Sequence, residues 1–275
     1  MPWQESASSS GNSLFPPLFL NGSRFSMLEG LIPPALFGPD LCFASAVVFI
    51  GGLIRGFSGF GSALIHAPML SWIWGPQIGV PVTALVEAGP VLLLARTALR
   101  ESHRRTVWAL GVPAMVLMPL GALILVAVHP DDMRRAIAVI VLLLAVILWT
   151  GWRYRGPRGL GPEIGVGMVG GTLAGAAGVA GPPAILFMMA SGDSPAQIRA
   201  NLIGYFTLVL LGLTATFALN GLIDANIIWK TTAITLPFLA GTWIGMRLFP
   251  LANERVFRNI ALALLTVSST WALLA

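Results

Sequence analysis

The chain has 275 residues, of which 10 % are charged and 56 % are hydrophobic, and its mean hydropathy is +0.83. Soluble domains carry about 25 % charged residues and disordered chains are polar and highly charged, so both classes are excluded. A single cysteine, Cys42, excludes a disulfide scaffold. The composition therefore predicts an all-α polytopic membrane protein.

The formal net charge of +5 does not indicate a nucleic-acid partner. The 16 basic residues lie in short clusters between apolar runs, which is typical of loops at a membrane surface. The sequence also lacks a His-Glu-x-x-His motif, a Walker loop and a Cys/His metal spacing. We therefore expect a lipid-embedded protein that needs neither metal nor cofactor and is not an enzyme.

Residues 1–37 are predicted to form a disordered or interfacial N-terminal arm. Their serines precede an apolar patch that prolines interrupt, and the first basic residue, Arg24, follows this patch. A signal peptide needs a basic start and an unbroken apolar stretch. We therefore do not interpret the arm as a signal peptide.

Beyond the arm, long uncharged runs predict helices that cross a bilayer, which takes about 20 residues. Single crossings are expected at 78–96, 107–128, 136–152 and 200–220. Cys42–Gly75 and Ile164–Gly192 are too long for one crossing and too short for two complete ones, and each has a glycine-dense centre. We expect each to be a broken pair of short helices, either a re-entrant hairpin or two short crossings, which gives eight to ten helical segments.

The two glycine-dense stretches are copies of each other. The glycines at 51, 52, 56 and 59 recur at 170, 171, 175 and 178, an offset of 119 residues. Further matches follow in the same order at offsets of 120 to 124, such as Gln77 with Gln197 and Gly121 with Gly245. We therefore predict a duplication, with a first transmembrane repeat at 38–155 and a second at 156–275.

Loop charges predict that the two repeats are inverted. The loop after 78–96 carries four arginines and is expected to be cytoplasmic, whereas its counterpart at 220–230 has only Asp224 and Lys230 as charges. Equivalent loops on opposite faces indicate inverted repeats, with both termini periplasmic. Inverted repeats with broken helices are typical of secondary transporters.

The first break offers an anion site. Arg55 precedes it, and a cation at membrane depth marks an ion pair or a substrate path. A helix that restarts near Ser62 would direct its free N–H groups and positive dipole end into the break. Ser58 adds a hydroxyl donor, and Gly59 and Gly61 allow close approach to the backbone. The alternative is tight helix packing, for which small residues are also chosen.

The second break supplies a similar restart around Gly178 and Gly181. Glu87, the single charge inside 78–96, either pairs with Arg55, carries a coupling proton or faces water. His66 lies on the helix after the first break, where a hydrogen-bonded core residue is the simpler interpretation than a proton relay.

Asn201 and Tyr205 complete the candidate substrate-binding set, whose other members are Arg55, Ser58, Gly59, Gly61, Ser62, His66, Gly178 and Gly181. They are four residues apart and so share one face of a helix. By the repeat offset they correspond to Pro81 and Leu85, beside Glu87. The substrate-binding prediction therefore includes both.

The motif Gly-Leu-Ile-Arg-Gly-Phe-Ser-Gly-Phe-Gly-Ser-Ala-Leu-Ile-His-Ala-Pro at 52–68 resembles the opening motif of the TauE/SafE sulfite-exporter-like permeases. Similar elements occur at 170–189 and 236–248, and the resemblance covers about 41–275. The chain departs from the pattern at Arg55 and Ser58. The resemblance implies a bacterial inner-membrane permease for sulfite or an organosulfur anion such as a sulfonate or sulfoacetate. An uncoupled anion channel, a non-transporting interaction protein and a homo-oligomer are left open.

Overall fold

The computed structural model describes residues 38–58, 60–150, 154–157, 159–248 and 254–274, and the arm at 1–37 lies outside them. The described residues are almost entirely helical, which confirms the all-α fold class. In chain order the helices are α2 (Pro39–Ser58), α3 (Ser62–Trp74), α4 (Pro76–Val86), α5 (Ala88–Glu101), α6 (Arg104–Ala127), α7 (Pro130–Trp149), α8 (Leu160–Ala177), α9 (Gly181–Met189), α10 (Pro195–Leu219), α11 (Ala225–Leu248) and α12 (Glu254–Leu274).

Three of these helices are long and apolar enough to cross a membrane: α2 over Pro39–Phe57, α6, and α10 over Ala196–Leu219. Large apolar side chains also face outward, such as Val116, Leu143 and Leu236, which are 67 %, 59 % and 74 % exposed. Water would disfavour such a surface, whereas lipid tails would not. The molecule is therefore a membrane protein, as its composition predicted.

Both glycine-dense stretches are broken into helix pairs, as predicted. Gly61 has a φ of +98° and separates α2 from α3, and Gly178 has a φ of +69° and ends α8 before α9. Residues that have a Cβ atom rarely adopt these left-handed backbone conformations. At Gly178 the backbone makes an αL cap, because the Gly178 N–H donates to the Ala174 carbonyl at 2.9 Å.

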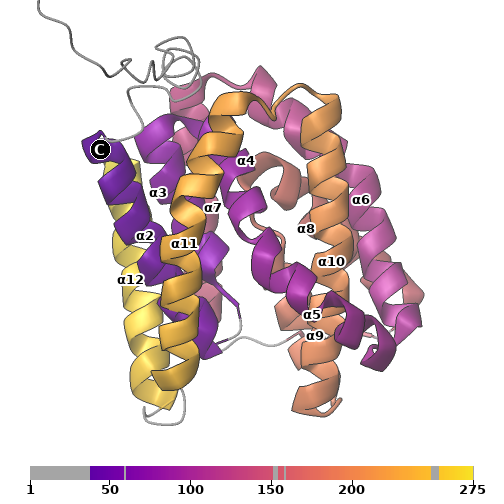
Figure 1. Cartoon of the computed structure of the whole chain (residues 1–275). Coiled ribbons are helices and arrows are strands. Elements are labelled where there is room, and N and C mark those ends of the chain that lie inside the picture. The colour runs from indigo at the N-terminus through magenta and orange to yellow at the C-terminus, as the bar shows by residue number, and fades with distance from the viewer. Residues whose placement is uncertain (1–37, 59, 151–153, 158, 249–253, 275) are drawn as a thin grey trace, which may run out of the picture. The chain divides into compact units, whose positions relative to one another are not determined.

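Glycines also bring helices of the two predicted repeats into backbone contact. These repeats are called here the first half (38–155) and the second half (156–275). A Cβ at Gly56 of α2 would collide with the Thr242 carbonyl of α11, and a Cβ at Gly175 of α8 would collide with the Met118 carbonyl of α6. Gly175 follows Gly56 by 119 residues, and Thr242 follows Met118 by 124. The first helix of each half thus packs against a long helix of the other half, and Figure 1 shows α2 beside α11 and α6 beside α8.

These matched contacts agree with the duplication in the sequence. The boundaries at 38–155 and 156–275 and the opposite orientation of the repeats in the membrane stay predictions.

The segment 78–96, expected to be one crossing, is divided in the structure. Glu87 lies in the turn between α4 and α5. Pro90 explains the break, because a proline lacks the N–H that would bond to the Val86 carbonyl and its ring disfavours a continuous helix there. The carboxylate of Glu87 consequently projects from a helix end.

Candidate functional site

A cavity of about 80 Å³ lies where the two glycine breaks meet. The first half contributes Arg55, Gly61 and Glu87 to its lining, and the second half contributes the residues from Gly178 to Pro182. The rest of the wall is mainly apolar and includes Phe60, Val91, Ile185, Phe206, Val209, Leu210 and Leu213. The cavity is thus shared by both halves and carries its charge on one side.

Arg55 and Glu87 form an ion pair at this cavity. Arg55 is in the last turn of α2, and its Nη1 atom contacts the Glu87 Oε2 atom and the Ser62 hydroxyl, the latter at 3.5 Å. The two charged side chains are only 14 % and 13 % exposed. The pairing compensates two charges that would each be costly to bury alone.

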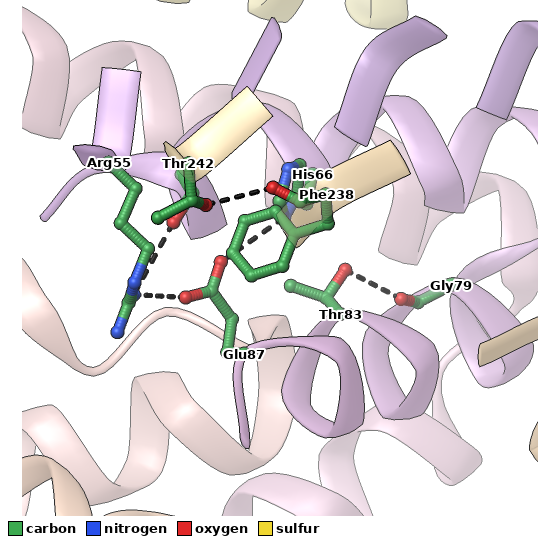
Figure 2. Close-up of polar contacts among 8 residues, drawn as sticks. Arg55, His66, Gly79, Thr83, Glu87, Phe238 and Thr242 are labelled. Atoms are coloured by element: carbon green, nitrogen blue, oxygen red, sulfur yellow. Dashed lines mark hydrogen bonds and ion pairs between the residues drawn. The ribbon is translucent and has the colours of Figure 1, made fainter. Parts of the chain in front are cut away.

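His66 contacts Glu87 from the side away from Arg55. Its Nδ1 atom lies 3.2 Å from Glu87 Oε1, and Figure 2 shows the carboxylate between the guanidinium and the imidazole. The imidazole is fully buried, packs edge-on against Phe238 and occupies space that a Cβ at Gly51 would need. Among the described residues, its Nε2 atom has no hydrogen-bond partner.

The two breaks differ in the backbone donors that they can offer. In the first break, α3 begins at Ser62, directly after the left-handed Gly61, and its first residues are not prolines, so each has a backbone N–H group. In the second, the N–H groups of Gly178 and Val179 donate back into α8, and the α9 residues Pro182 and Pro183 have no N–H. The prediction that amides around Gly178–Gly181 hold an anion is therefore narrowed to Ala180 and Gly181.

A comparison with protein families matches this chain from residue 44 to 271 with the model described as Sulfite exporter TauE/SafE. The chain belongs to the TauE/SafE sulfite exporter family. The matched range contains both glycine breaks, Arg55 and Glu87. Neither the curated proteins nor the solved structures include a match to this chain. The family is one of membrane transporters, so the predicted family and the predicted class of membrane permease are confirmed.

In this TauE/SafE protein, Asn201 and Tyr205 do not line the cavity. Asn201 Oδ1 accepts hydrogen bonds from the His103 backbone N–H at 2.7 Å and from Gln197 Nε2 at 3.1 Å, which ties α10 to the turn before α6. The Tyr205 hydroxyl donates to the Ala180 carbonyl at 3.3 Å and so supports the second break from behind.

Two further predicted residues lie wholly or partly outside the described structure. Gly59 is outside the described residues, and Ser58 is described only as the last residue of α2, without its side chain. Of the predicted set, the structure therefore places Arg55, Gly61, Glu87, Gly178 and Gly181 at the cavity. Ser62 and His66 lie next to them, in contact with Arg55 and Glu87.

The apolar wall of the cavity could not be predicted from the sequence. Phe206, Leu210 and Val91 line the cavity, but in a chain with 56 % hydrophobic residues they look the same as residues that face lipid.

The charged cluster belongs to the first half alone. At the repeat offsets, Arg55 and Ser62 correspond to Ala174 and Gly181, while His66 and Glu87 correspond to Ile185 and Thr207. Among the described residues, the matched positions of the predicted repeats thus carry one ionic site rather than two symmetric ones.

Proposed function

We propose that this family member is a secondary transporter that binds a small anion in the cavity between the two glycine breaks. Its substrate would be sulfite or an organosulfur anion such as a sulfonate or sulfoacetate. It would work by alternating access in the bacterial inner membrane, with both termini on the periplasmic side. The observation that carries the proposal is the position of Arg55, a cation within the candidate membrane span Pro39–Phe57 and at a cavity that both halves line.

The chemistry of the cavity suits an anion. The guanidinium of Arg55 offers planar donors that match the oxygen atoms of a sulfur oxyanion. The amino end of α3 adds partial positive charge from the same side. The pair with Glu87 keeps Arg55 ordered when no anion is bound.

The size of the cavity favours a ligand with few heavy atoms. Its volume of about 80 Å³ is smaller than the roughly 150 Å³ of an engineered cavity that binds benzene. This supports sulfite and the shortest sulfonates over larger organosulfur anions.

The packing of the halves supports alternating access. The contacts of α2 with α11 and of α6 with α8 join helices of different halves through glycines. The breaks next to these contacts place non-helical backbone at the cavity, as discontinuous helices do in transporters. A movement of the α2–α11 pair against the α6–α8 pair, each kept together by its glycine contacts, would expose the cavity to each side in turn.

Flux measurements on the full chain in proteoliposomes test the proposal. We expect radiolabelled sulfite to enter loaded vesicles and to exchange against internal sulfite, and Arg55→Gln to abolish this uptake. Arg135→Gln is the matched control, because Arg135 is exposed and remote from the cavity lining. Conductance without exchange would instead indicate an anion channel. Absence of both binding and flux for sulfite, methanesulfonate and sulfoacetate would leave a non-transporting protein and refute the proposal.

A further inference from the structure

We infer that binding of the anion to Arg55 is coupled to protonation of Glu87, so that the protein carries one monoanion together with one proton. This inference rests on the proposed function, since it concerns the same cavity. It assigns a coupling ion and a charge class of substrate, neither of which the family match specifies.

The first step of the argument is competition for Arg55. Its Nη1 atom contacts Glu87 and Ser62 in the structure. An anion in the cavity would need the same guanidinium donors, so it must displace the Glu87 carboxylate at least in part. The displaced carboxylate would be left charged in a setting that is only 13 % exposed.

The second step is the charge balance of the cavity. The ionisable groups that line it, among the described residues, are Arg55 from α2 and Glu87 between α4 and α5. From α3, His66 and the Ser62 hydroxyl also face this pair. The walls from the α8–α9 turn, α9 and α10 are glycine or apolar. The charges of Arg55 and Glu87 cancel, so the ionisable groups that line the empty cavity have a net charge of zero.

Adding a monoanion would make the charge −1, which is unfavourable in an enclosed apolar site. One proton, taken from water by the Glu87 carboxylate, restores neutrality. The hydrogen bonds of Arg55 then pass from the carboxylate to the anion. A dianion would require a second proton, for which the cavity lining offers no second carboxylate.

The apolar wall gives the third step. Besides the ionic pair, the apolar side chains of Phe60, Phe206 and Leu210 line the cavity. A monoanion with one charged head and a short apolar body satisfies both sides, because its head can bind Arg55 while its body excludes water from the wall. A short alkanesulfonate has this chemistry, and it stays singly charged over the whole physiological pH range.

Methanesulfonate is therefore the probe for counting protons. Titration calorimetry of the purified full chain in buffers of different ionisation enthalpy gives the number of protons taken up per anion bound. We expect about one proton for the wild type, and an affinity that weakens about tenfold per pH unit on the alkaline side. Glu87→Gln should bind methanesulfonate with an affinity independent of pH and without proton uptake. Glu101→Gln, at the exposed end of α5, is the control and should behave like the wild type.

The flux experiment gives a second readout. Uptake of methanesulfonate by wild-type proteoliposomes should acidify the lumen without generating a membrane potential, and Glu87→Gln should lose the acidification. Binding or flux of methanesulfonate or sulfite without proton uptake in the wild type would overturn the inference and leave the proposed transporter intact. Absence of anion binding and flux altogether would overturn both. If Glu87→Gln does not fold, the number of protons that the wild type takes up per methanesulfonate bound still decides the inference.

Discussion

Arg55 and Glu87 are 32 residues apart in the chain, yet they form an ion pair at the point where both glycine breaks meet. This relationship separates two roles of Arg55, one in stability and one in ligand binding. Removing one partner of a buried pair leaves the other charge uncompensated, whereas removing both does not.

Arg55→Gln should therefore lower the free energy of unfolding by roughly 3 kcal/mol and also abolish anion binding. The double variant Arg55→Gln/Glu87→Gln should recover most of the stability but none of the binding. Thermal unfolding in detergent and sulfite binding, measured on the same samples, check this. Anion binding by the double variant at wild-type affinity would contradict a role of Arg55 in the site.

The glycines of the inter-half contacts give a paired prediction. Gly56→Ala and Gly175→Ala should each destabilise the protein by about 1–3 kcal/mol, because the added methyl group would collide with backbone atoms of the facing helix. Gly165→Ala on α8 is the matched control, since a Cβ there meets no atom within 4 Å. It should be neutral or slightly stabilising. A large difference between Gly56→Ala and Gly175→Ala would show that the two contacts are not equivalent.

Tyr205→Phe tests the support of the second break. It removes the hydroxyl that donates to the Ala180 carbonyl, at a cost of about 1 kcal/mol. We expect slower transport with anion affinity changed less than threefold, because Arg55 is untouched. Tyr154→Phe is the control, as its hydroxyl contacts the Pro157 carbonyl in an exposed segment. Unchanged transport in Tyr205→Phe would show that the Tyr205 hydroxyl is not needed for transport.

Pro90→Ala tests whether the break at Glu87 matters. Alanine restores the N–H that can bond to the Val86 carbonyl, so α4 and α5 can join into one helix and carry the Glu87 carboxylate away from Arg55. We expect stability to be kept and transport to fall at least tenfold. Pro119→Ala in α6, exposed and outside the cavity lining, should leave transport unchanged. Full activity of Pro90→Ala would show that the break is dispensable.

His66→Gln tests the contact on the other side of the carboxylate. The imidazole lies 3.2 Å from Glu87 Oε1, so replacing it should move the pH profile of methanesulfonate binding along the pH axis. A merely structural role would lower the melting temperature without moving the profile. Calorimetric titrations between pH 5 and pH 9 distinguish the two outcomes.

Most of the fold could be predicted from the sequence, because the patterns that indicate it are either local, such as apolar runs, or repeated, such as the glycines. Apolar length predicted α6, α7 and α10, and the duplicated glycines predicted both breaks. Arg55 and Glu87 stood out because a charge is rare inside an apolar run. Their pairing could not be decided, since it depends on the turn that Pro90 imposes and on how α2 packs.

Asn201 and Tyr205 show that closeness to Glu87 in the aligned sequence does not place a side chain at the cavity. They correspond to Pro81 and Leu85 of α4, which do not line the cavity either, whereas Ala84 of the same helix does. Closeness in sequence does not decide which face of a helix meets a cavity. The apolar wall was missed for another reason, because hydrophobicity alone does not distinguish a cavity from a lipid-facing surface.

The packing of α2 against α11 and of α8 against α6, in which each helix contacts one from the other half, also has a consequence for biogenesis. The main partner of α2 begins at Ala225, whereas α2 ends at Ser58, so α2 must wait for about 170 residues of further synthesis, on the order of 10–30 s at 5–20 residues per second. Until then its row of small residues faces lipid without a helix to pack against. The nascent first half should therefore be a substrate for membrane chaperones and proteases. Two halves separated within 151–159 should accumulate when they are produced together and be degraded when either is produced alone.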